Sequence, residues 1–62
     1  MVRVKFETWS RVWYKDCHRI EHARSLAAGL CARWAYPISA TVYVGSYEVA
    51  EYHNNRVANV RQ

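Results

Sequence analysis

The sequence predicts an α+β fold, with one helix packed on a three- to four-stranded, mainly antiparallel sheet in the order β-(β)-α-β-β. Three observations predict it: alternating apolar and charged residues at 2–7, an amphipathic stretch from 16 to about 35, and two β-rich segments joined at 45–46. A chain of 62 residues has room for one small core, so we expect a single compact domain, 1–62.

The first segment, VRVKFE at 2–7, has the period of a strand with one buried face. The stretch WSRVWYK that follows is rich in β-forming residues, but Trp13 and Tyr14 interrupt the alternation. It is therefore either a second short strand, after a turn near 9–11, or a continuation of the first strand with a bulge.

A helix is expected from Asp16, whose carboxylate suits an N-cap, to about Ala35, because Pro37 disfavours helical geometry in the residue before it. Apolar side chains fall on one arc of this helix and predict its buried face. The arc consists of Ile20, Ala23, Leu26, Ala27, Leu30, Cys31 and Trp34. Small residues, among them Gly29, form a stripe on the other side that a partner could approach closely.

The segments ATVYV and YEVAEY predict a hairpin around Gly45 and Ser46, since glycine at the first central position suits a type II′ turn. In this register Val42 faces Val49. The last residues, about 56–62, are expected to form a short strand or a frayed tail.

One helix covers only one face of a sheet, so the other face should be free for a partner. The chain is also rich in rings, with three Trp, five Tyr and one Phe, more than a small core can easily hide. From this surface and the exposed rings we select as candidate partner-binding residues Arg3, Lys5, Trp9, Arg11, Tyr43 and Tyr52.

A metal site is suggested by His18, Glu21 and His22, whose order resembles the H-x-x-E-H signature of the inverzincins, zinc peptidases that use the glutamate as general base. The resemblance covers five residues. Both histidines would lie opposite the apolar arc, where no second wall of protein can enclose them. The sequence therefore favours a solvated polar face, and we expect no enzyme, no metal site and no cofactor.

The net charge of +4 favours an acidic partner or nucleic acid, although the nine Lys and Arg residues are scattered. The leading hypothesis is a small non-enzymatic protein that binds a protein partner, a format shared by small phage or accessory inhibitors of host machinery. The alternative is a nucleic-acid-binding protein that uses aromatic and basic residues of the sheet. Open strand edges leave a homodimer possible. No apolar run reaches the ~20 residues that span a bilayer, so we expect a cytoplasmic protein.

Overall fold

Strand β1 (Val2–Glu7) lies inside a four-stranded sheet of order β2-β1-β3-β4, in which all neighbouring strands are antiparallel. The structure is a computed structural model that describes residues 1–35 and 37–54. The strand or frayed tail expected at about 56–62 lies outside the described residues. Within them, the chain forms the predicted α+β fold.

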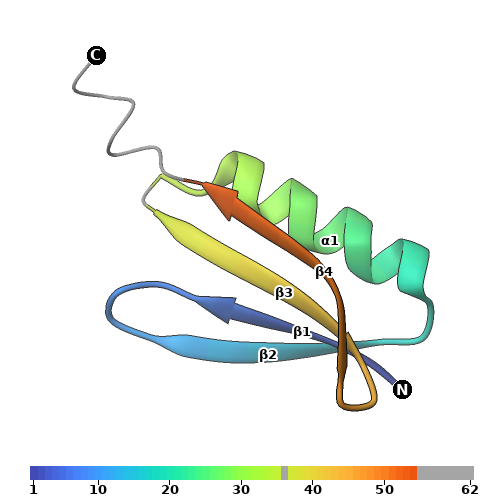
Figure 1. The fold of residues 1–62 in the computed structure, drawn as a ribbon. Helices are drawn as coiled ribbons and strands as arrows, with labels where there is room; N and C mark the ends of the chain where they lie inside the picture. Colours follow the sequence, from blue (N-terminus) through green and yellow to red (C-terminus); the bar gives the residue numbers. More distant parts are fainter. Residues whose placement is uncertain (36, 55–62) are drawn as a thin grey trace.

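The remaining elements follow in the order strand, helix, strand, strand. They are β2 (Val12–Cys17), α1 (Ile20–Arg33), β3 (Ile38–Val44) and β4 (Tyr47–Asn54). Both β2 and β3 run antiparallel to β1, so they are parallel to each other, and α1 connects them across one face of the sheet. Figure 1 shows α1 lying along β3 and β4, with the opposite face of the sheet uncovered.

The core lies between α1 and the sheet. Its residues on α1 are small, namely Ala23, Ala27 and Cys31, which lets the helix approach the strands closely. The strands contribute the larger buried side chains, which are Val2, Val4, Phe6, Cys17, Ile38 and Val42, together with Ala40.

The second strand extends further than expected, and the N-cap prediction is wrong. Asp16 lies in β2, where it pairs with Arg3 of β1 and forms an ion pair with its side chain. The helix begins at Ile20, and Arg19 occupies the N-cap position without a side-chain cap. Cys17 is therefore the buried end of β2 rather than a helical residue, and both cysteines of the chain are free. Pairing with β1 outweighs the local capping preference.

The helix ends at Arg33, two residues before the expected end, because a strand supplies its cap. Trp34 takes an extended conformation while its N–H still donates to the carbonyl of Leu30. The Asn54 amide nitrogen, at the end of β4, donates to the carbonyl of Cys31 and, at 3.2 Å, to that of Trp34. Carbonyls that the last helical turn leaves unpaired are thus bound by β4.

The hairpin turn agrees with the sequence, and so does the strand register as far as Tyr43–Glu48, but the register differs beyond that pair. Gly45 has a φ of 62° while Ser46 does not have a positive φ, as a type II′ turn requires. A bulge then inserts Val49, so that Val42 pairs with Ala50 rather than with Val49. One extra residue reverses the alternation of side chains in the rest of β4.

Candidate interaction surface

Twelve side chains project from the face of the sheet that α1 leaves uncovered. Directly paired residues of an antiparallel sheet point to the same side, and the buried Val2, Val4 and Phe6 mark the covered side. We call the other side the open face. It consists of Val12, Tyr14 and Asp16 of β2, Arg3, Lys5 and Glu7 of β1, Ser39, Thr41 and Tyr43 of β3, and Glu48, Glu51 and His53 of β4.

The two cations of the open face are both held by carboxylates. Arg3 Nε lies 2.8 Å from Asp16 Oδ1, and Lys5 Nζ lies 3.8 Å from Glu7 Oε1. The hydrogen bond from Arg3 lowers the pKa of Asp16, and the same contact raises the pKa of Arg3. The positive charges at Arg3 and Lys5 are therefore largely neutralised within the face.

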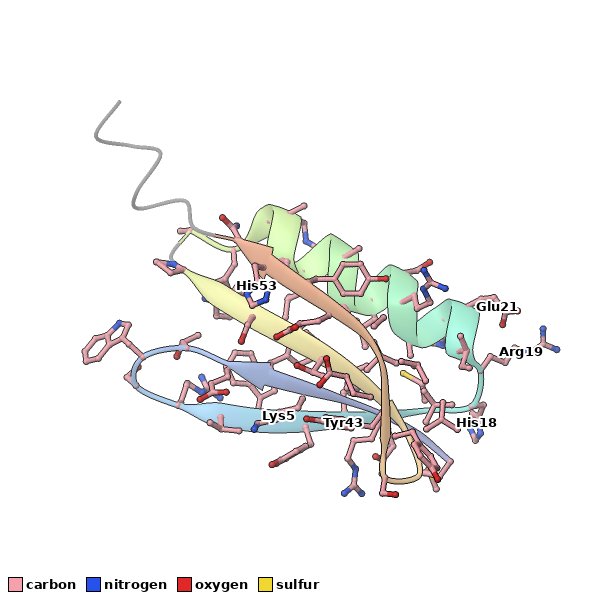
Figure 2. The ribbon with its side chains drawn as sticks, viewed as in Figure 1. Lys5, His18, Arg19, Glu21, Tyr43 and His53 are labelled. Carbon is pink, nitrogen blue, oxygen red and sulfur yellow. The ribbon has the colours of Figure 1, made fainter. Side chains whose placement is uncertain are left out.

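Two rings lie among these charges. Tyr14 is exposed, and the Arg3 guanidinium carbon lies 5.7 Å from its ring centroid. Tyr43 is half-buried and pairs with Arg3 on the other side. Figure 2 shows Lys5 and Tyr43 on the side of the sheet away from α1. The face thus combines apolar ring surface with charged groups, as protein interfaces do.

Trp9 lies at the tip of the β1–β2 loop and is 89% exposed. The loop is held by Thr8, whose N–H donates to the Arg11 carbonyl at 2.9 Å. The Thr8 hydroxyl oxygen accepts from the N–H groups of Ser10 and Arg11 at 3.3 and 3.2 Å. The sequence predicted an exposed ring at Trp9 and, as one alternative, a turn near 9–11; the structure places Trp9 on a hydrogen-bonded turn.

A shallow hollow of about 290 Å³ connects this loop to the open face. It runs from Trp9 past Pro37 to His53, and Glu7 and Ser39 of the open face also line it. A second hollow, of about 410 Å³, lies between Trp9, Arg11 and Trp34 on the helix side. Trp9 therefore stands at one edge of the open face.

Two of the six candidate residues lie on the other side of the sheet. The Arg11 guanidinium carbon is 4.5 Å from the ring centroid of Trp13, which packs against the core. Tyr52 was expected on the uncovered face, but the bulge at Val49 turns it toward α1, where its hydroxyl accepts a hydrogen bond from Arg24 at 3.3 Å. This contact also raises the pKa of Arg24.

The H-x-x-E-H residues do not share one helical face. His18 precedes α1, on the connection after β2, whereas Glu21 and His22 belong to its first turn, and all three are exposed. Figure 2 shows His18 and Glu21 on these two segments. Since His18 is outside the helix, the i, i+4 spacing does not place the two histidines on one helical face. Among residues 1–35 and 37–54, no three His, Cys, Asp or Glu side chains are grouped as metal ligands.

The surroundings of Gly29, on the small-residue stripe of α1, do not require a glycine. A Cβ added to Gly29 would lie 3.4 Å from Nη1 of Arg33, one turn further along the helix. The guanidinium thus lies close to the glycine.

Sequence reasoning missed Asp16, Glu51, Tyr14 and His53 as residues of the open face. The signal for Tyr14 and Asp16 was their alternation with Trp13, Lys15 and Cys17, which continues the strand pattern. No local signal marks Glu51 and His53, because their side depends on the bulge.

Comparisons with protein-family models, with curated proteins and with solved structures yield no match. No helix in the described part of the chain is long and apolar enough to cross a membrane. Conclusions on function therefore depend on the surface itself.

Proposed function

We propose that this chain is a small non-enzymatic protein that binds a protein partner through the open face and Trp9. The observation that carries the proposal is Trp9, a large ring that is 89% exposed on a turn fixed by Thr8. Exposed tryptophan is the side chain most enriched among residues that dominate binding energy. Because the turn that carries the ring is already hydrogen-bonded, less backbone ordering is needed on binding, so more of the contact energy remains.

The open face extends the contact beyond this single ring. It lies beside Trp9 across the hollow at His53, and it offers Tyr14 and Tyr43. An uncovered sheet face suits a protein surface better than a small molecule, which needs a concave site. Inhibition of host machinery is one role that such binding would serve. The free thiols of Cys17 and Cys31 agree with the reducing cytoplasm that the sequence predicts.

The charges of the face disfavour the nucleic-acid alternative. Arg3 and Lys5 would have to leave Asp16 and Glu7 before they could bind phosphate. Arg11 lies over Trp13, away from the face. Polarisation titrations with mixed DNA and RNA oligonucleotides, at two salt concentrations, test this alternative. Salt-sensitive micromolar binding that Arg3→Ala or Lys5→Ala removes would favour nucleic acid over protein.

Affinity capture tests the proposal directly. The full chain, Trp9→Ala and Tyr47→Ala would each be used to capture proteins from nuclease-treated lysate of the source cells, followed by quantitative mass spectrometry. Tyr47 is a matched control because its ring is 77% exposed and lies by the β3–β4 turn, at the end of the sheet opposite Trp9. We expect one partner to be retained by Tyr47→Ala and lost with Trp9→Ala. Equal capture by all three proteins would contradict the proposal.

A further inference from the structure

The acidic residues of this basic chain are concentrated on one surface. Four of its five carboxylates, those of Glu7, Asp16, Glu48 and Glu51, belong to the open face. With its two cations against four carboxylates, the face has a net charge of −2 when His53 is neutral, although the whole chain has +4. The open face therefore attracts positive groups, in contrast to the chain as a whole.

Within the open face, the unbalanced negative charge lies on the side of β4. Arg3 of β1 forms an ion pair with Asp16 of β2, and Lys5 forms one with Glu7 of the same strand, β1. Among the described residues of the chain, Glu51 on β4 forms an ion pair only with His53, at 3.2 Å, and Glu48 forms none. Glu48 pairs in register with Tyr43, so the two residues occupy neighbouring positions of the open face on adjacent strands.

We infer that the partner bound by the open face is a protein segment rich in Lys and Arg, an inference that rests on the proposed function. A guanidinium or ammonium group placed over Tyr43 gains a cation–π contact with the ring and an ion pair with Glu48. Glu51 supplies a second carboxylate for the next basic side chain. Complementary charge of this kind speeds encounter and excludes acidic partners.

A second copy of the chain is the competing occupant. The described residues outside the open face carry five cations, Arg11, Lys15, Arg19, Arg24 and Arg33, against the single carboxylate of Glu21, a net charge of +4. If the positively charged side of one copy bound the open face of another, the contact would be head to tail. Each added copy would then leave its own open face free for the next. Association of this kind gives a closed ring only if the rotation between copies allows it, and otherwise an open filament.

The chain offers a matched pair of variants to test the inference. Glu48→Gln and Glu21→Gln are the same substitution and change the net charge equally, but the first lies on the open face and the second on the exposed first turn of α1. The probe is a short fluorescein-labelled peptide rich in Lys and Arg, with a peptide of equal length rich in Glu as its counterpart. Fluorescence polarisation is measured with the full chain at low and at physiological ionic strength.

We expect the basic peptide to bind, the acidic peptide not to bind, and salt to weaken the complex. Glu48→Gln should weaken binding by roughly two- to fivefold, as expected for loss of one partly exposed ion pair. Glu21→Gln should leave the affinity within error. Equal losses for the two variants would show attraction by overall charge only and would overturn the inference, as would preference for the acidic peptide.

Two further results separate this inference from the proposed function. If Trp9→Ala loses the captured partner but Glu48→Gln retains both partner and peptide, Glu48 does not contribute to binding, and only the inference fails. Sedimentation analysis without peptide tests whether a second copy of the chain is the occupant. An apparent molecular mass that rises with protein concentration, and is lower in Glu48→Gln, would identify self-association and also overturn the inference. An unchanging monomer mass, together with the expected peptide results, supports it.

Discussion

Two tryptophans four residues apart should differ sharply in their effect on stability. Trp9 projects from its loop, whereas Trp13 packs between Phe6 and Trp34, with ring centroids 5.4 and 5.6 Å away. The proposed function requires this difference, because a ring that is needed by the core is not free for a partner. Trp9→Ala and Trp13→Ala measure it.

The structure sets the size of the two effects. Replacing a buried Trp by Ala costs about 3–5 kcal/mol, and since Trp13 is only partly buried we expect about 3 kcal/mol. A domain of this length has a free energy of unfolding of about 3–9 kcal/mol. Trp13→Ala therefore removes a third or more of the free energy of unfolding. Trp9→Ala should stay within about 0.5 kcal/mol of the wild type, as exposed substitutions do.

Urea unfolding followed by far-UV circular dichroism is the appropriate assay, because the variants differ in tryptophan fluorescence. With a slope of about 1 kcal/mol per molar urea, Trp13→Ala should lower the midpoint by about 3 M, while Trp9→Ala leaves it almost unchanged. Equal shifts for both variants would refute the division into a structural ring and a binding ring. A urea midpoint of Trp13→Ala equal to that of the wild type would refute it as well.

Three other predictions concern the helix end, the ion pair and the thiol. Asn54→Asp replaces the amide that donates to the carbonyls of Cys31 and Trp34 by a carboxylate, which cannot donate. The substitution should lower the free energy of unfolding by about 2–3 kcal/mol at neutral pH, and by less in acid, where the introduced carboxyl is protonated. Urea unfolding at both pH values checks this. Because the pKa of Asp16 is lowered, its ion pair with Arg3 stabilises the fold at pH values above the ordinary Asp pKa, and this stabilisation is lost as pH falls through the lowered pKa. The melting temperatures of wild type and Asp16→Asn should therefore converge in acid. A difference in melting temperature that stays constant with pH would contradict this. Burial raises the pKa of the Cys31 thiol, so iodoacetamide should label it slowly in the native chain and rapidly in urea, as mass spectrometry will show.

Local pattern was sufficient for the fold class and for much of the open face. Alternation at 2–7 placed Arg3, Lys5 and Glu7 opposite the core, and the Gly45–Ser46 turn fixed the tight hairpin. These features depend on neighbours in the sequence, which is why a pattern of period two reveals them.

Asp16 shows where local reasoning fails. Its side chain suits a helix N-cap, but pairing with β1 and the contact with Arg3 keep it in a strand. Tyr52 shows the same limit, because the bulge at Val49 moves it from the open face to the helix side. Arg11 is likewise turned away from the face by the ring of Trp13.

The sequence by itself determined one helix, its apolar side and a sheet with one face left over, because hydrophobic periodicity is a local property. Only the tertiary structure decided that this face carries most of the carboxylates of a basic chain, and that its two cations are already paired. The physical reason is that register, bulges and ion pairs join residues that are distant in sequence, so charge on a surface is fixed by strand pairing and not by composition.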